Sequence, residues 1–145
     1  MYEGYWYVDD VKTPAGLVFW QGDYYYAASG GKIVTSKSYW ISKPNDLLPQ
    51  GTYRFDEEGK AILTTEIVDE EGTLYYYQDG KRTAGVGLIK IDGSYYYVDG
   101  SAKIAVNTTR WIENTNGIVE PGTYTFGADG KMIPKMKISD NPAKI

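Results

Sequence analysis

The chain has 145 residues with 15 basic and 19 acidic side chains, and its net charge of -4 leaves no basic excess to neutralise nucleic-acid phosphates. It contains no cysteine and no histidine, which excludes disulfides, thiolate or imidazole metal sites and catalytic triads with an imidazole base. Its 15 tyrosines and 17 glycines, against 3 phenylalanines and 3 methionines, indicate aromatic strands rather than a large aliphatic core. No apolar run approaches the ~20 residues of a membrane-spanning helix, so we expect no membrane insertion.

The first half of the chain reads as three hairpin-like units. Residues 3–15 look like a degenerate copy of residues 71–84. In residues 16–33, Gly22 separates an apolar stretch from a tyrosine triplet, and glycine tolerates the positive φ that a tight hairpin turn needs. In residues 38–63, two strands flank a loop with two prolines, and a turn leads into a third strand.

The second half repeats this order, with units at residues 67–84, 87–104 and 108–133. An offset of 71 aligns residues 16–62 with residues 87–133 without a gap, and 18 of the 47 aligned positions are identical. The identities fall on turn glycines and strand aromatics. We therefore predict an all-β chain of tandem β-hairpin repeats, forming an elongated solenoid-like array of two 71-residue super-repeats with three hairpin units each.

The same alignment gives the predicted domain boundaries. The first super-repeat covers residues 1–63 and the second covers residues 64–133. Residues 134–145 form either the start of a further unit or a tail. Because a repeat-like unit follows the first methionine directly, we expect the chain to be a monomeric fragment of a larger surface protein.

The repeated pattern is G-L-x4-G-x-Y-Y-Y-x5-K-I followed by G-T-Y-x-F-x3-G-K. It resembles the cell-wall-binding repeats of Gram-positive surface proteins, a group that includes choline-binding and glucan-binding repeats. The resemblance covers residues 3–133. It implies a string of β-hairpins, an extracellular location at the cell surface or in secreted form, and cell-wall polysaccharide or another glycan as partner. The choline-binding pattern places a tryptophan of its cation-binding cage directly after the repeat glycine, where this chain has Leu17 and Leu88.

The candidate binding residues are aromatic. Successive strand side chains alternate between faces, so the first and third tyrosines of each triplet share one face. Inward rings form a thin core, whereas outward rings can stack on sugar faces or surround a cation. Core packing is thus the competing interpretation at each position. The predicted ligand-binding residues are Trp20, Tyr24, Tyr26, Trp40, Tyr75, Tyr77, Tyr95, Tyr97 and Trp111.

Carboxylates cluster at residues 9–10, 56–58 and 69–71, but nothing pairs two of them across one bond as a glycosidase requires. The spacing of a calcium-binding loop is also absent from the sequence. We therefore predict no catalytic residue, no metal site and no cofactor. The predicted function is non-catalytic attachment to cell wall or other polysaccharide through aromatic grooves between hairpins. The alternatives are a stalk of a surface adhesin without its own ligand, and a fibre-like receptor-binding module.

Overall fold

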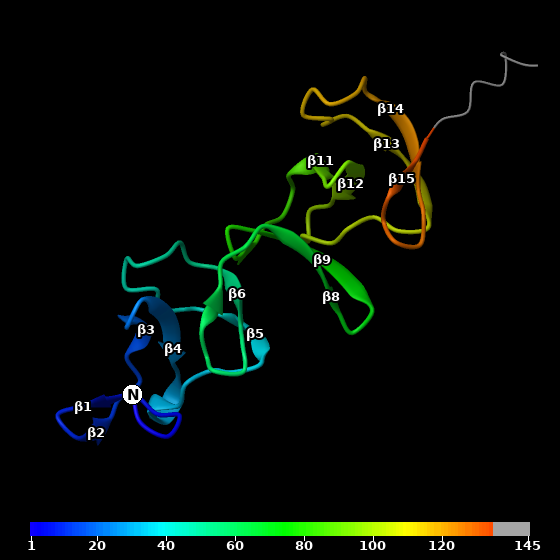
Figure 1. Cartoon of the computed structure of the whole chain (residues 1–145). Coiled ribbons are helices and arrows are strands. Elements are labelled where there is room, and N and C mark those ends of the chain that lie inside the picture. The colour runs from blue at the N-terminus through cyan, green and yellow to red at the C-terminus, as the bar shows by residue number, and fades with distance from the viewer. Residues whose placement is uncertain (135–145) are drawn as a thin grey trace, which may run out of the picture. The chain divides into compact units, whose positions relative to one another are not determined.

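The computed structural model of the chain describes residues 1–134 (Figure 1). Within that range the regular structure consists of short β-strands and one 3₁₀ turn, so the predicted all-β class is confirmed. The predicted further unit or tail lies, apart from Pro134, outside the described residues. The elements are β1 (Tyr7–Val8), β2 (Val11–Lys12), β3 (Gly16–Trp20), β4 (Asp23–Ala27), η1 (Ser29–Gly31), β5 (Lys37–Trp40), β6 (Thr52–Phe55), β7 (Ala61–Ile62), β8 (Glu66–Glu70), β9 (Thr73–Gln78), β10 (Lys81–Arg82), β11 (Gly87–Ile91), β12 (Ser94–Val98), β13 (Thr108–Ile112), β14 (Gly122–Phe126) and β15 (Met132–Ile133).

The chain divides into two compact units. The first contains Met1–Glu66 and Tyr77–Arg82, and the second contains Ile67–Tyr76 and the chain from Thr83 onward. In the first unit β1 pairs with β2, β3 pairs with β4, and β6 pairs with β5, β7 and β10. In the second unit β11 pairs with β12, and β14 pairs with β13 and β15. All of these pairings are antiparallel, as expected for hairpins.

The central hairpins, β3–β4 and β11–β12, turn through two residues with positive φ. These are Gln21 (49°) and Gly22 (87°) in the first hairpin, and Asp92 (48°) and Gly93 (83°) in the second. A two-residue turn with both φ values positive follows the right-handed twist of the flanking strands, and glycine adopts this conformation without steric cost. The predicted turn at Gly22 is confirmed.

The central hairpins are packed on both faces. In the first unit Tyr24 and Tyr26 pack in one hydrophobic cluster, whereas Tyr25 packs in another with Ile33. The second unit repeats this division, since the side chains on either side of Tyr96 pack in a different cluster from Tyr96 itself. The predicted alternation of the tyrosine triplets is therefore correct, and each face has its own core.

An asparagine in each long loop fastens that loop to the preceding hairpin. Asn45 donates from Nδ2 to the carbonyls of Ala15 and Leu17, both at 2.8 Å. The residue 71 positions later, Asn116, makes the corresponding bonds at 2.6 and 2.7 Å. Both asparagines have positive φ, a conformation that asparagine tolerates better than most residues.

The glycine that begins each central hairpin lies against the same loop. A Cβ on Gly16 would be 2.6 Å from the carbonyl oxygen of Lys43, and a Cβ on Gly87 would be 2.5 Å from that of Asn114. Both glycines also have φ close to +80°. The repeated glycine is therefore explained by close approach and by backbone conformation together.

Candidate functional site

Two of the nine predicted binding residues are core residues of the first unit. The hydroxyl of Tyr26 accepts from the backbone N–H of Lys43 at 3.2 Å and lies 3.3 Å from the hydroxyl of Ser42. Tyr77 has no exposed surface, and its hydroxyl accepts from the guanidinium of Arg82. Core packing therefore describes both positions, and neither ring offers a face to a ligand.

Five of the predicted residues are half-buried, and several contact a neighbouring cation or ring. The ring of Tyr24 lies 4.8 Å from that of Phe19, between centroids. At the corresponding position of the second unit, Lys90 lies over the ring of Tyr95 at 5.6 Å. A guanidinium covers Tyr97, at 4.5 Å from the ring centroid. The half-buried residues are Trp20, Tyr24, Tyr75, Tyr95 and Tyr97.

The remaining two predicted residues, Trp40 and Trp111, are exposed. Trp40 is 56% exposed and Trp111 is 61% exposed. Each is the residue before a fully buried isoleucine, Ile41 or Ile112, so strand alternation turns the indole outward. These two tryptophans occupy the same position in the two copies, since they are 71 residues apart.

Hydroxyl groups lie beside the exposed tryptophans. Trp40 pairs across the strands with Thr52, and Trp111 pairs with Thr123. The indole Nε1 of Trp111 donates to the carboxylate of Glu113 at 3.2 Å, which holds the ring at the surface. An exposed apolar ring beside hydroxyl and carboxylate groups can stack on a sugar face and bond to its hydroxyls.

Phe19 is an exposed aromatic side chain on β3 that was not among the predicted residues. It lies opposite Tyr24 in the register of β3 and β4, on the face of Leu17 but beside the turn. The core cluster ends before it, so the ring remains exposed. The sequence offered one signal for Phe19. In a hairpin that turns at Gly22, Phe19 is expected opposite Tyr24, which is a predicted binding residue.

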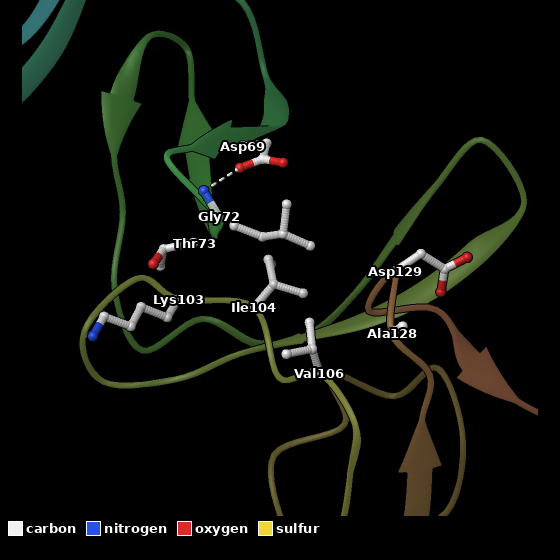
Figure 2. Close-up of a pocket in the computed structure, with 9 residues that line it drawn as sticks. Asp69, Gly72, Thr73, Lys103, Ile104, Val106, Ala128 and Asp129 are labelled. Carbon is white, nitrogen blue, oxygen red and sulfur yellow. Dashed lines mark hydrogen bonds between the residues drawn. The ribbon is translucent and has the colours of Figure 1, made fainter.

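The second unit also contains a cavity of about 490 Å³. Figure 2 shows Ile104 and Val106 next to each other in the lining, which also includes Asp69 and Asp129. Asp69 accepts from the backbone N–H of Gly72 at 2.8 Å, and Asp129 accepts from that of Lys131 at 3.0 Å. Both carboxylates therefore stabilise turns. None of the nine predicted residues lines this cavity.

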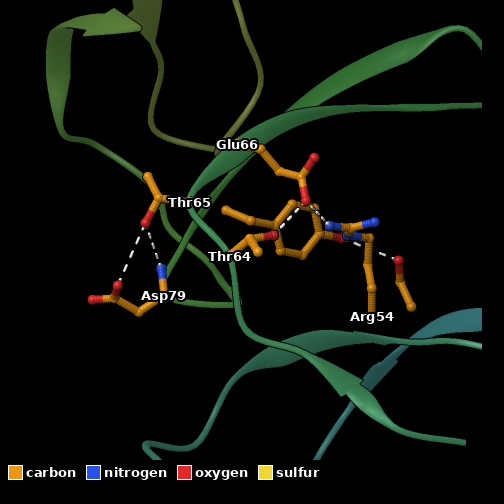
Figure 3. A network of polar contacts seen from close by, with 7 residues as sticks. Arg54, Thr64, Thr65, Glu66 and Asp79 are labelled. Carbon is orange, nitrogen blue, oxygen red and sulfur yellow. Dashed lines mark hydrogen bonds and ion pairs between the residues drawn. The ribbon is translucent and has the colours of Figure 1, made fainter.

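A polar network in the first unit surrounds Glu66 (Figure 3). Glu66 accepts from the hydroxyl of Thr64 and forms an ion pair of 2.5 Å with Arg54. The Thr64 hydrogen bond, followed by the bond and charge of Arg54, lowers the pKa of Glu66 against the opposing effect of desolvation. A carboxylate that is held ionised is a poor general acid, so the contacts of Glu66 are assigned a structural role and not a catalytic one. A separate pair in Figure 3 joins Asp79 to Thr65, because the backbone N–H of Asp79 donates to the Thr65 hydroxyl at 2.9 Å.

No group of three acidic, cysteine or histidine side chains within residues 1–134 is arranged to hold a metal ion. The same range contains no helix with the length and apolar character needed to cross a membrane.

Comparison with known proteins gives relatives of one kind. No family model matches the chain. Glucosyltransferase-S of Streptococcus mutans serotype c (strain ATCC 700610 / UA159) is 32% identical in an alignment of 114 positions, and the match covers 63% of this chain and 8% of that protein. The structure of CbpF in complex with ipratropium has a TM-score of 0.53 at 19% identity, over 90% of this chain and 38% of that one. Truncated alternansucrase from Leuconostoc mesenteroides NRRL B-1355 has a TM-score of 0.58 at 17% identity, over 82% of this chain and 10% of that one.

The chain is similar to choline-binding and glucan-binding repeat proteins of the cell-wall-binding group. The predicted resemblance is thus confirmed. The chain spans only 8% of Glucosyltransferase-S, so it corresponds to a small part of that protein.

The position at which the resemblance places a choline-binding cage tryptophan is occupied by a leucine in both units. The residues after the repeat glycines, Leu17 and Leu88, are almost completely buried in the two units. They contribute to the clusters that contain Tyr26 and Tyr124, respectively. Leu17 and Leu88 are therefore core residues, and the exposed tryptophans that recur in both units lie on β5 and β13.

Proposed function

We propose that this chain is a non-catalytic binding module for cell-wall polysaccharide or glucan, and that Trp40 and Trp111 are its two sugar-stacking platforms. One observation carries the proposal. Among the large apolar side chains that are exposed in residues 1–134, only these two occupy equivalent positions in the two copies. Exposed Phe19, for example, corresponds to Lys90 in the second copy. An exposed indole that recurs while its exposed neighbours vary is better explained by binding than by packing.

The predicted aromatic grooves between hairpins are here assigned to named residues. Half-buried Tyr24 and Tyr95 are secondary candidates, because part of each ring remains accessible beside Phe19 and Lys90. Two weak sites on one chain act together on a polymeric ligand, since binding at one site raises the effective concentration at the other. We further propose the two super-repeats at residues 1–63 and 64–133, an elongated array and an extracellular location. The repeated asparagine bonds and the relatives reported above support these assignments.

The test is retention on insoluble ligand. The chain is mixed with purified Gram-positive cell walls or insoluble glucan, and the bound fraction is compared for the wild type, Trp40→Ala, Trp111→Ala and the double variant. We expect each single variant to bind about tenfold more weakly and the double variant to show no retention. Tyr2→Ala is the matched control, because Tyr2 is an exposed aromatic residue, at 65%, without a repeated counterpart in this alignment.

Circular dichroism shows whether each variant is folded. A folded double variant that is retained like the wild type would eliminate the tryptophans as platforms. If the wild type is retained on no wall or glucan, the binding function itself fails and the stalk interpretation replaces it.

A further inference from the structure

One face of the central hairpin differs in charge between the two units. In the first unit the rings of Tyr24 and Tyr26, two residues apart on β4, each contact a second aromatic ring. Phe19 lies 4.8 Å from Tyr24, and Tyr39 lies 5.3 Å from Tyr26, between ring centroids. These contacts on the face of the first unit are therefore between uncharged rings.

The second unit keeps both tyrosines of this face, as Tyr95 and Tyr97, and replaces both of their partners with cations. At the offset of 71, Lys90 occupies the position of the phenylalanine and Arg110 occupies that of the partner tyrosine. The ammonium of Lys90 lies 5.6 Å from the ring centroid of Tyr95, and the guanidinium of Arg110 lies 4.5 Å from that of Tyr97. Each tyrosine thus has a partner in both units, but in the second unit the face gains two positive charges.

Strand geometry places both cations at the edge of the hydrophobic core of the second unit. Lys90 is two residues from buried Leu88, and Arg110 is two residues from buried Ile112, so each cation shares a strand face with a core residue. Both cations are nevertheless exposed. Within residues 1–134 neither of them forms an ion pair with a carboxylate. Their charges are therefore available to a ligand.

The tyrosine hydroxyls of this face are available as well. In the first unit the hydroxyl of Tyr26 is used internally, because it accepts from the backbone N–H of Lys43 at 3.2 Å. Among the described residues, the hydroxyls of Tyr95 and Tyr97 make no hydrogen bond. Each of these two hydroxyls can therefore donate to an acceptor atom of a ligand.

We propose that this face of the second unit, which we call the cationic face and which consists of Lys90, Tyr95, Tyr97 and Arg110, binds an anionic group of a cell-wall polysaccharide, either a phosphate or a carboxylate. A guanidinium presents a planar fork of donors that matches the oxygens of both groups. Two like charges on one face also attract an anion to it. The inference rests on the proposed binding function and adds a ligand class at a second surface, since strand alternation turns Arg110 away from the face of Trp111.

Packing alone does not account for the cationic face. A cation over a tyrosine ring is a favourable contact, but the aromatic partners of the first unit contact the corresponding rings as well. Packing therefore gives no reason to place two like charges on one face, whereas an anionic ligand does.

The test compares glucans that differ only in their charged groups. Affinity electrophoresis measures the dissociation constant of the full chain for neutral dextran, carboxymethyl dextran and phosphorylated dextran. We expect the wild type to bind at least one of the anionic dextrans about tenfold more tightly than neutral dextran. This preference should disappear at about 1 M salt, where the Debye length is only ~3 Å. The two anionic dextrans distinguish a carboxylate ligand from a phosphate ligand.

Exchange of residues between the units tests the cationic face directly. Lys90→Phe/Arg110→Tyr introduces the residues of the first unit, and it should lose the preference for anionic dextran while it still binds neutral dextran. Lys103→Gln/Lys131→Gln is the matched control, because it also removes two exposed positive charges from the second unit but none from this face. The control should keep the preference.

The reverse exchange, Phe19→Lys/Tyr39→Arg, keeps the proposal testable if the first exchange prevents folding, which circular dichroism shows. It should increase the affinity for anionic dextran, because it creates a second cationic face in the first unit.

Three results would overturn the proposal. The first is a wild type that binds neutral and anionic dextrans equally. The second is a control that loses the preference as completely as Lys90→Phe/Arg110→Tyr does. The third is a reverse exchange that gains no affinity for anionic dextran. Failure of this proposal is distinguishable from failure of the sugar platforms, because only the platforms fail if Trp40→Ala/Trp111→Ala binds neutral dextran like the wild type while the preference for anionic dextran persists.

Discussion

The repeated asparagines offer a quantitative test of what holds the long loops in place. Asn45→Ala removes two hydrogen bonds to backbone carbonyls, each of which contributes about 1 kcal/mol net. It also places alanine at a φ of 55°, which adds roughly 0.5 to 1 kcal/mol. We therefore expect a loss of about 2.5 to 3 kcal/mol in the free energy of unfolding of the first unit. Asn116→Ala should have the same effect on the second unit.

Asn107→Ala is the matched control for the backbone contribution. Asn107 has a φ of 49°, and its side chain makes no hydrogen bond within the described residues. Its replacement should therefore cost only the conformational part, about 1 kcal/mol or less. Urea denaturation followed by circular dichroism measures all three variants, and hydrogen exchange at the amide of Leu17 reports on the first unit alone. An Asn45→Ala variant no less stable than Asn107→Ala would refute the argument that these side chains fasten the loops.

Two further predictions concern glycine and pH. Gly16→Ala and Gly87→Ala should each cost more than ~3 kcal/mol or prevent folding, whereas Gly22→Ala, which has positive φ but open space around its Cα, should cost about 1 kcal/mol in urea denaturation. Similar costs for Gly16→Ala and Gly22→Ala would mean that the close approach to Lys43 is unimportant. The pKa of Glu66 is lowered in the folded state, so its stabilising contribution is present above the ordinary value of 4.5 and is lost as pH falls through the lower folded pKa. Glu66→Gln should therefore reduce the loss of stability in this acidic range, measured as the free energy of unfolding against pH, and an unchanged profile would contradict this assignment.

Much of the fold could be predicted because the relevant signals are local. A glycine at a two-residue turn needs only its own φ, and the alternation of Tyr24, Tyr25 and Tyr26 follows from strand geometry. The depth of burial of each ring could not be predicted in this way. Alternation identifies a core face when the other face meets water, but in β4 both faces are packed. Tyr26 is consequently buried although it shares a face with half-buried Tyr24.

The candidate site shows the same division between local and distant causes. Trp40 and Trp111 are exposed because each precedes an inward isoleucine, and this relation can be read from the sequence. Tyr77 is buried because Ser38 and Arg54, more than twenty residues earlier in the chain, receive it. No local pattern around Tyr77 distinguishes it from Tyr75, which is only half-buried. Repetition supplies the missing criterion, since an aromatic residue that recurs and is exposed in both copies has no packing role that accounts for it. By that criterion the tryptophans, rather than the more numerous tyrosines, are the residues to mutate first.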